Sequence, residues 1–328
     1  VKAILLTQKG NDIHVVAAAC EPILGDAFAE REVKDFDAIS NCIKKIKHRL
    51  KLKSKDVSVA VSGASVLTKL VYMPPDQTDV ELESQIELEA DSLIPFPIDD
   101  VYIDFEKLGT QTEGRDDVLL SVAHKNMIDS RITLLRELEF EPQIIDIEGF
   151  ALGNALLHFG EIPANTPTAC FNIGATQLQL TVVDENSDIH SKEIPFGTDN
   201  LINDICLFHG LDKGTAIQQL RDNTLPEHWR TDAYPHFLGN LQQNISKVMQ
   251  LYTGSENKKA PENLLISGGG ALIPGLIEDL STDMNKSFNV FNPMAKLVNT
   301  NEHSNTEAGP LYTIALGLAC RSFDTCHI

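Results

Sequence analysis

A strand–turn–strand pattern occurs near the start of this sequence and again past its middle. Residues 1–19 (VKAILLTQKGNDIHVVAAA) and 178–196 (LQLTVVDENSDIHSKEIPF) each place a polar turn between two β-prone runs. The tripeptide Asp-Ile-His recurs at Asp12–His14 and Asp188–His190, although the copies slip by one residue when aligned, which makes them weak evidence of duplication. If the duplication is real, the chain forms two similarly built lobes with a crevice between them.

The segments that precede the two copies differ. A glycine turn at residues 173–176 lies just before the second copy, whereas the first copy starts at Val1. The chain is therefore expected to begin after its own first strand and first glycine turn.

The length and the charge of the chain limit the number of its domains and the kinds of partner that it can bind. The 328 residues suffice for two domains of about 150 residues each. With 27 Lys and Arg against 47 Asp and Glu residues, the formal net charge is −20, which disfavours binding to nucleic acid or directly to anionic lipid. No apolar run approaches the roughly 20 residues of a membrane span, and no signal peptide is recognisable. Six scattered cysteines without a CxxC pair indicate reduced thiols in a cytoplasmic protein: Cys20, Cys42, Cys170, Cys206, Cys320 and Cys326.

The first half of the chain mixes strands and helices. Alternating apolar residues predict strands, and apolar residues at spacings of three and four predict helices. Thr78 and Glu81 have the spacing of a capping box, and Pro95 ends the helix that they begin. Residues 57–140 are therefore predicted to be a small α+β unit in the order βαββα. The expected strands are 1–6, 12–19, 56–63, 101–109, 117–124 and 143–150, and two further helices are expected at 36–50 and 126–140.

The second half should contain a buried strand, a glycine turn and two more strands, followed by helices. A helical region is predicted from Thr198 to about Gln250, with a break near Pro226. Residues 263–280 are predicted as strand, triple-glycine turn and helix. Residues 308–323 are predicted as a terminal helix whose small residues suit close packing against a sheet.

Two glycine-rich turns are candidate phosphate sites. Phosphate binds best where backbone N–H groups converge and no Cβ blocks the approach. NIGAT (172–176) and SGGGA (267–271) both follow predicted strands, and FGTDN (196–200) ends the neighbouring strand pattern. A single glycine turn of this kind more often serves only to reverse the chain. For the two turns together, binding of a nucleotide between them is as probable as a purely structural role.

Other chemistries find little support. The sequence has no GxxxxGK[ST] loop, no HExxH and no GxSxG, and no strand-borne GxGxxG with a suitably placed acid. Asp146 and Glu148 would share one face of a strand end and could hold Mg²⁺ through water; helix capping or solvation explains them equally well. Eleven acids and no Lys or Arg fall between Lys69 and Lys107, which is either a groove for a basic partner or, more often, a solvated face.

Several segments together resemble one family. They follow, in order, the pattern of the PilM family, which comprises actin-like cytoplasmic proteins of type IV pilus assembly and twitching motility that are related in fold to the division protein FtsA. The resemblance covers nearly the whole chain, and its most specific parts are the IPFP segment with its following acids and FGTDNL. The matching segments are 90–105, 117–152, 171–180, 196–205 and 266–280.

The resemblance implies an α/β, actin-like (ribonuclease H-like) fold of two lobes with an FtsA-type 1C subdomain. A nucleotide would lie in the cleft between the lobes. The implied subdomains are 1A at 1–56 (N-terminally incomplete), 1C at 57–140, 1A again at 141–166, 2A at 167–200, 2B at 201–262, 2A at 263–307 and the C-terminal helix of 1A at 308–328.

The family's motifs also imply site residues, with ATP and Mg²⁺ as cofactors. Asp146 and Glu148 match the acids near the metal. The implied nucleotide-binding residues are Asn172, Gly174, Ala175, Thr176, Gly197, Asn200, Gly268, Gly269, Gly270 and Ala271.

Three departures from the family pattern bear on these cofactors. The first phosphate loop of the family is not in this sequence. In residues 213–222, the Glu and the Lys that relatives place against the nucleoside are missing from their positions. Asn172 stands where the superfamily usually has Asp. An amide does not supply the negative charge that orients hydrated Mg²⁺. The departures indicate weak or absent nucleotide binding and little or no ATPase activity, and no catalytic residue is assigned.

The resemblance thus implies an adaptor rather than an enzyme. It would bind the N-terminal cytoplasmic tail of PilN in a groove between 1A and 1C, and meet other inner-membrane and motor proteins of the pilus machinery. It would be cytoplasmic and reach the inner membrane only through partners, while homo-oligomerisation stays open. Ile94, Phe96, Glu81 and Asp91 are the expected partner contacts.

Two other functions remain as alternatives. An FtsA-like filament-forming protein would sediment as polymers with nucleotide. An actin-fold phosphotransferase would turn over ATP with a small acceptor.

Overall fold

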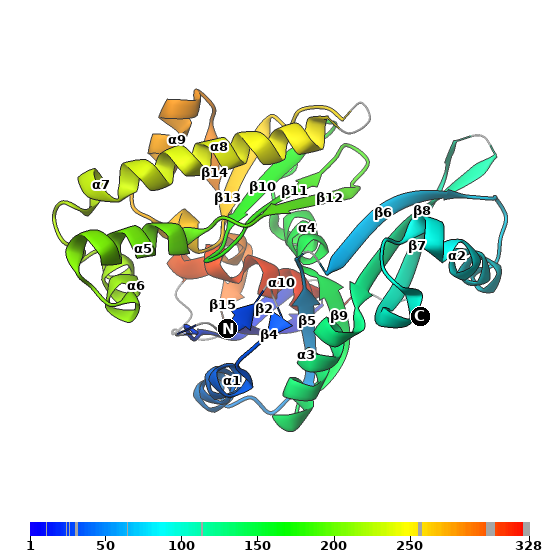
Figure 1. Cartoon of the computed structure of the whole chain (residues 1–328), viewed down its shortest axis with the longest axis horizontal. Coiled ribbons are helices and arrows are strands. Elements are labelled where there is room, and N and C mark those ends of the chain that lie inside the picture. Colours follow the sequence, from blue (N-terminus) through cyan, green and yellow to red (C-terminus); the bar gives the residue numbers. More distant parts are fainter. Residues whose placement is uncertain are drawn as a thin grey trace. The chain divides into compact units, whose positions relative to one another are not determined.

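The chain divides into two compact units (Figure 1). Unit 1 comprises Val1–Gly25, Asn41–Lys53 and Glu148–Ile328, and unit 2 comprises Asp26–Ser40 and Ser54–Ile147. The helix α1 (Phe36–Leu50) runs from residues of unit 2 into residues of unit 1. The computed structural model describes residues 1–10, 12–23, 25, 27–29, 32–63, 65–112, 114–254, 258–299 and 306–323.

The described residues of unit 1 form two sheets. In the first, β1 (Lys2–Lys9) and β2 (Asp12–Cys20) form an antiparallel hairpin, and β15 (Val298–Asn299) pairs parallel with β2. The second has five strands in the order β12-β11-β10-β13-β14. Its strands are β10 (Thr168–Ile173), β11 (Leu178–Val183), β12 (Ile189–Ile194), β13 (Asn263–Ser267) and β14 (Phe288–Val290).

Both copies of the repeated sequence pattern are hairpins. The first is β1–β2 and the second is β11–β12, and both are antiparallel. The strand–turn–strand prediction is therefore confirmed, while the duplication itself stays a prediction.

Helices cover both faces of the five-stranded sheet in unit 1 (Figure 1). The helices α5 (Thr198–His209), α8 (Tyr234–Thr253) and α9 (Leu276–Met284) contribute to the core on one face, and α4 (Glu148–Phe159) and α10 (Thr313–Cys320) to the core on the other. Shorter elements are α6 (Lys213–Arg221), α7 (Trp229–Asp232) and the 3-10 turns η2 (Gly269–Leu272), η3 (Pro293–Lys296) and η4 (Thr306–Tyr312).

The strand β10 lies at the centre of this arrangement. Its side chains alternate, because successive residues of a strand point to opposite faces. Phe171 and Ile173 belong to the core beneath α5 and α8, whereas Cys170 belongs to the core beneath α4 and α10. All three are fully buried, so β10 is held from both sides.

In unit 2, the residues that the structure describes also form two larger sheets. The first is an antiparallel sheet with the strand order β6-β8-β7, and one of its faces packs against α2 (Asp79–Leu93). In the second, β5 pairs parallel with β9 beside α3 (Lys125–Glu137). A two-stranded hairpin, β3 with β4, and the 3-10 turn η1 (Ile98–Asp100) are further elements in the described part of this unit. Its strands are β3 (Phe28–Ala29), β4 (Glu32–Val33), β5 (Asp56–Val61), β6 (Val66–Met73), β7 (Val101–Thr112), β8 (Arg115–His124) and β9 (Glu141–Ile147).

Three sequence expectations need correction. The order βαββα omitted β6, which forms an edge of the three-stranded sheet. The expected strand 143–150 ends at Ile147, because Glu148 begins α4. The terminal helix α10 packs chiefly against α4 and also against β1, rather than against a sheet alone.

The helix α2 follows its predicted signals closely. The Thr78 hydroxyl accepts the Glu81 N–H at 3.3 Å, and the Glu81 carboxylate accepts the Thr78 N–H at 2.8 Å. These two bonds form the predicted capping box. The Thr78 N–H and the Thr78 hydroxyl both donate to the Glu81 carboxylate and lower its pKa. The helix ends at Leu93, before Pro95.

Candidate functional site

The two predicted phosphate turns follow neighbouring parallel strands. In the register of β10 with β13, Asn172 lies opposite Ser267, the last residue of β13. Because the carboxyl ends of parallel strands meet at one edge of a sheet, the turns after β10 and β13 lie side by side. The structure therefore brings together two segments that are far apart in the sequence.

The first turn, residues 172–176, is held by the start of α5. The Gly174 N–H closes the turn by donating to the Gln177 carbonyl at 2.8 Å. The Thr198 and Asp199 N–H groups donate to the Gly174 and Ala175 carbonyls at 2.9 and 2.8 Å. The N-terminus of α5 is thus hydrogen-bonded to the turn.

Gly197 and Asn200 brace this contact. A Cβ on Gly197 would lie 2.3 Å from the Ala175 carbonyl oxygen, so only glycine allows the approach. The Asn200 side-chain oxygen accepts the Gly197 N–H at 3.2 Å, and the Asn200 N–H donates to the Gly197 carbonyl at 3.1 Å. Both residues position the turn, and their N–H groups are occupied by protein acceptors.

The second turn, residues 267–271, lies directly against the first. Gly268 has φ +81° and ψ −173°, a region that is essentially restricted to glycine. A Cβ there would lie 2.5 Å from the Ile173 carbonyl oxygen and 2.6 Å from Oδ1 of Asn172, and a Cβ on Gly270 would lie 2.4 Å from Cγ2 of Ile173. Gly268 and Gly270 are therefore needed because the end of β10 occupies this space.

The side chain of Ser267 holds the second turn in place. Its buried hydroxyl bonds with the Thr313 hydroxyl at 2.5 Å and donates to the Pro310 carbonyl at 3.3 Å. The Gly268 N–H also donates to the Pro310 carbonyl, at 3.0 Å. The segment around η4 and the start of α10 thereby fixes the position of the turn.

Four backbone N–H groups in the two turns fit an anionic ligand. Within the described part of the chain, the N–H groups of Ala175, Thr176, Gly269 and Gly270 have no protein acceptor. Ala175 and Thr176 are exposed, and Gly269 is half-buried. Adjacent N–H groups of this kind bind phosphate oxygens. These residues therefore fit the phosphate groups of a nucleotide.

Replacement of Gly268 by alanine should disrupt the junction of the turns. We expect the free energy of unfolding to fall by about 1–3 kcal/mol from the backbone conformation alone. Urea unfolding followed by circular dichroism measures the change. Gly269→Ala is the matched control, because its Cβ would meet only a leucine side-chain atom at 3.4 Å. Equal stability of Gly268→Ala and wild type would contradict the described contact.

An ion pair beside the first turn was not expected from the sequence. Lys213 Nζ lies 2.7 Å from Oδ2 of Asp199, and Asp199 lies in the first turn of α5. At the other end of α6, Arg221 Nη2 lies 4.0 Å from Sγ of Cys20 on β2. The helix α6 is thus linked to α5 at its start and to β2 at its end.

Arg230 anchors the loop that leaves the second turn. Its guanidinium donates to the Pro274 carbonyl at 2.6 Å and to Asp279 at 2.8 Å, and lies over the rings of Trp229 and Tyr234. The Tyr234 hydroxyl donates to the same Asp279 carboxylate at 2.6 Å. Burial and the neighbouring Asp279 raise the pKa of Tyr234 well above its usual value, so it stays a neutral donor.

The predicted metal residues occupy two different elements. Asp146 lies in β9, and its Oδ1 accepts the N–H of Ile147 at 2.7 Å. Glu148 is the first residue of α4, so the period-two argument for the pair does not hold. Among the described residues, no group of three or more His, Cys, Asp and Glu side chains is placed to hold a metal ion. A metal at these residues stays a prediction.

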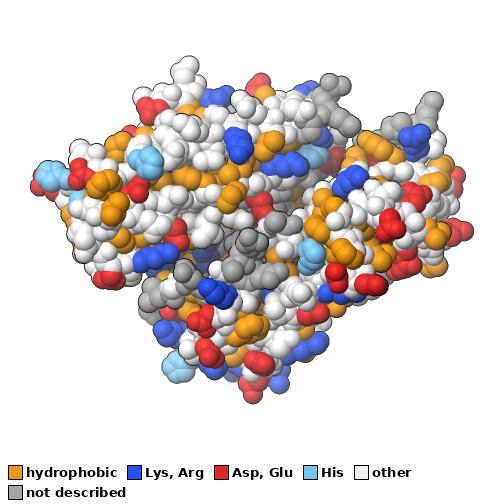
Figure 2. All heavy atoms as spheres, in the orientation of Figure 1, with side chains coloured by type: hydrophobic (Ala, Val, Ile, Leu, Met, Phe, Trp, Pro, Cys, Tyr) orange, Lys and Arg blue, Asp and Glu red, His pale blue; other side chains and the backbone are white. Residues whose placement is uncertain are grey.

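The four predicted partner residues differ in accessibility. Ile94 is only 4% exposed and belongs to the core beneath α2. Phe96 is half-buried with its ring centroid 4.4 Å from that of His124. Glu81 and Asp91 are exposed on α2, and Figure 2 shows acidic side chains gathered over this helix at the right of the view. Ile94 therefore has little surface to offer a partner, and the partner contacts of all four residues stay a prediction.

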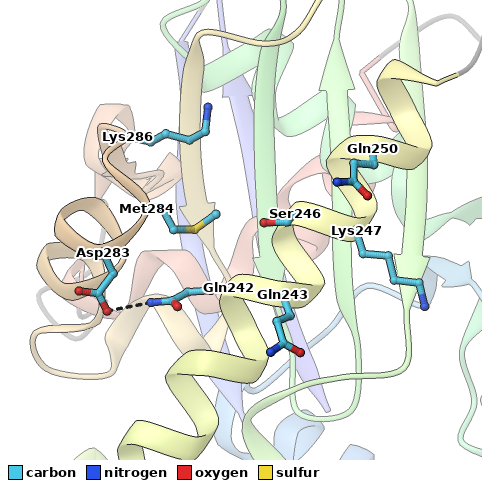
Figure 3. Close-up of a pocket in the computed structure, with 8 residues that line it drawn as sticks. All are labelled: Gln242, Gln243, Ser246, Lys247, Gln250, Asp283, Met284 and Lys286. Atoms are coloured by element: carbon cyan, nitrogen blue, oxygen red, sulfur yellow. Dashed lines mark hydrogen bonds between the residues drawn. The ribbon is translucent and has the colours of Figure 1, made fainter.

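A separate groove lies between α8 and the end of α9 (Figure 3). Its volume is about 580 Å³, and Gln242 spans it by donating to Asp283 at 2.9 Å. None of the predicted site residues lines it. The lining residues are Gln242, Gln243, Ser246, Lys247, Gln250, Asp283, Met284 and Lys286.

Solved structures share this fold. One described as "PilM-PilN type IV pilus biogenesis complex" is 23% identical, with a TM-score of 0.83 over 98% of this chain and 95% of that chain. The ethanolamine utilization protein EutJ from Carboxydothermus hydrogenoformans is 13% identical, with a TM-score of 0.54 over 90% of this chain and 78% of that chain. MreB 5 of Spiroplasma citri bound to AMPPNP is 14% identical, with a TM-score of 0.47 over 97% and 80%.

The mixed α/β architecture, with glycine turns meeting at the ends of β10 and β13, is shared with the PilM–PilN structure over nearly the whole chain. In the described part of the chain, no helix is both long and apolar enough to cross a membrane. The family model for type IV pilus assembly protein PilM matches residues 1–323, and the chain belongs to this family.

Proposed function

We propose that this type IV pilus assembly protein is an adaptor that binds the N-terminal cytoplasmic tail of PilN. The observation that carries the proposal is the likeness, over 98% of the chain, to a structure described as a PilM–PilN complex. In this proposal the protein stays at the cytoplasmic face of the inner membrane and reaches it only through partners. It connects PilN with other inner-membrane and motor proteins of the machinery.

Unit 2 supports a peptide-binding role. We assign residues 57–140 to an FtsA-type 1C subdomain and propose that the tail docks on its surface. Phe96 offers a half-buried aromatic anchor, and β7, an edge strand of the sheet, begins shortly after it. Extended peptides bind such sites by pairing with an edge strand and by filling side-chain pockets. Glu81 and Asp91 would form a polar rim.

The meeting of the two turns supports nucleotide binding in unit 1. Ala175, Thr176, Gly269 and Gly270 would hold phosphate oxygens through their N–H groups, and Gly174, Gly197, Asn200, Gly268 and Ala271 would maintain the shape of the site. A bound Mg²⁺ would balance phosphate charge. Because Asn172 supplies an amide rather than a carboxylate, we propose that hydrolysis is weak or absent.

Removal of the Phe96 ring should weaken binding of the tail. We expect Phe96→Ala to raise the Kd of a PilN-tail peptide about tenfold, since buried aromatic anchors carry much of the affinity at peptide interfaces. Isothermal titration calorimetry with wild-type and variant protein measures this change.

Two controls keep this test specific. Leu207→Ala removes an apolar side chain that is 77% exposed on α5 of unit 1, and it should leave the Kd unchanged. Phe96→Leu keeps an apolar side chain and should lose less affinity than Phe96→Ala. An unchanged Kd for Phe96→Ala would remove this surface from the proposal, and absence of binding to wild type would refute the adaptor function.

A further inference from the structure

Asp199 places a negative charge beside the candidate phosphate site. Its N–H donates to the Ala175 carbonyl at 2.8 Å, so Asp199 lies directly beside the first turn. A carboxylate there opposes an incoming anion, since like charges at short range repel. The site would bind phosphate poorly if this charge were not balanced.

Lys213 supplies the balancing charge. Its Nζ lies 2.7 Å from Oδ2 of Asp199, with the two side chains 39% and 25% exposed. An ammonium group has three donors, and in the described part of the chain only one of them has a partner. Two donors are therefore available to a further oxygen ligand.

The backbone of Lys213 is fixed at the start of α6. Asp212 caps α6 by accepting the Thr215 N–H at 3.0 Å and the Thr215 hydroxyl at 2.6 Å. The four-carbon stem of lysine lets the ammonium move while the helix stays in place.

We propose that Lys213 is a phosphate ligand that moves from Asp199 to the bound polyphosphate when a nucleotide occupies the two turns. This inference rests on the proposed nucleotide binding. The ligand class is a polyphosphate, whether Mg²⁺-ATP or inorganic tripolyphosphate. Asp199 acts as the resting partner that holds the ammonium beside the site until an anion replaces it.

The test compares two variants that are expected to change the Kd for a polyphosphate in opposite directions. Lys213→Ala leaves the Asp199 charge unbalanced and should raise the Kd for Mg²⁺-ATP about tenfold, whereas Asp199→Asn removes the competing carboxylate and should lower it about threefold. Calorimetric titration of the whole chain with Mg²⁺-ATP, and separately with tripolyphosphate, gives both values. If the nucleoside has no role in the exchange, the ratios between variants are the same for both ligands.

Matched variants separate this role from a structural one. Lys247→Ala removes the same charge from α8 in the groove of Figure 3 and should leave the Kd unchanged. Lys213→Arg keeps the charge and should retain most of the affinity. If the ion pair only stabilised the fold, Lys213→Ala and Asp199→Asn would weaken binding in the same direction, and this result would overturn the inference.

The outcomes also distinguish a failure of the proposed role of Lys213 from a failure of the proposed nucleotide binding. If wild type binds neither ligand, both the nucleotide proposal and the role of Lys213 are refuted. If wild type binds and the two variants match it, nucleotide binding stands and only the exchange by Lys213 is refuted.

Discussion

Gly317→Ala is expected to lower the free energy of unfolding by about 3 kcal/mol. In the interior of α10, a Cβ on Gly317 would lie 1.7 Å from the carbonyl oxygen of Ala151 and 2.6 Å from its carbonyl carbon. Both are backbone atoms of α4, so neither can move without shifting the helix. The overlap outweighs the gain of up to about 1 kcal/mol that alanine gives a helix over glycine. Urea unfolding followed by circular dichroism measures the difference.

Gly239→Ala is the matched control for this prediction. It makes the same change inside α8, where no atom lies within 4 Å of the new Cβ. This variant should be equal to wild type or more stable by up to about 1 kcal/mol. A Gly317→Ala protein as stable as Gly239→Ala would show that α10 and α4 do not pack as described.

Phe237→Ala should lower the free energy of unfolding by about 3–5 kcal/mol, the usual effect of removing a buried aromatic ring. Phe237 on α8 is 1% exposed, and its ring stacks on that of Phe196 with centroids 5.5 Å apart. Phe196 directly precedes Gly197, so the cavity would also loosen the contact between α5 and the first turn. Thermal and urea unfolding, with fluorescence of the single Trp229 as a second probe, measure the loss.

Phe208→Ala tests whether the effect comes from burial. It removes the same ring from a position on α5 that is 57% exposed, and it should change stability by less than about 0.5 kcal/mol. Similar losses in both variants would argue against the stacked core beneath α8.

Local signals predicted much of the fold. The capping box of Thr78 and Glu81 and the stop at Pro95 set the ends of α2, because both act within a few residues of the chain. The two hairpins followed from alternation around polar turns. The sequence placed each glycine turn after a strand, but their meeting follows from the parallel pairing of β10 with β13, which no local pattern marked.

Elements with apolar residues on both sides were missed. On β6, Leu70 and Tyr72 are apolar although they are 40% and 48% exposed, so the strand lacks a clear alternation with polar residues. The helix α4 is buried on most of its surface, which hides the helical period. Gly149 and Gly153 also lower its helix propensity, and both are needed because a Cβ would lie 2.3 Å from the Ser191 side chain and 2.5 Å from the Ile189 side chain, respectively.

The finer features of the candidate sites depend on contacts between elements. The pair of Asp199 with Lys213 joins the start of one helix to the start of the next, and neither spacing nor composition marks it. The burial of Ile94 likewise follows from the packing of α2 on its sheet. Sequence patterns give the face of an element but not what lies against that face.

The hydrogen bonds from the first turn of α5 to residues 174 and 175 have a kinetic consequence. The amide hydrogens of Thr198 and Asp199 are already bonded before any ligand arrives, so the loop has little conformational freedom left to lose on complex formation. Association at such a preformed loop should be limited by encounter and desolvation rather than by a slow rearrangement.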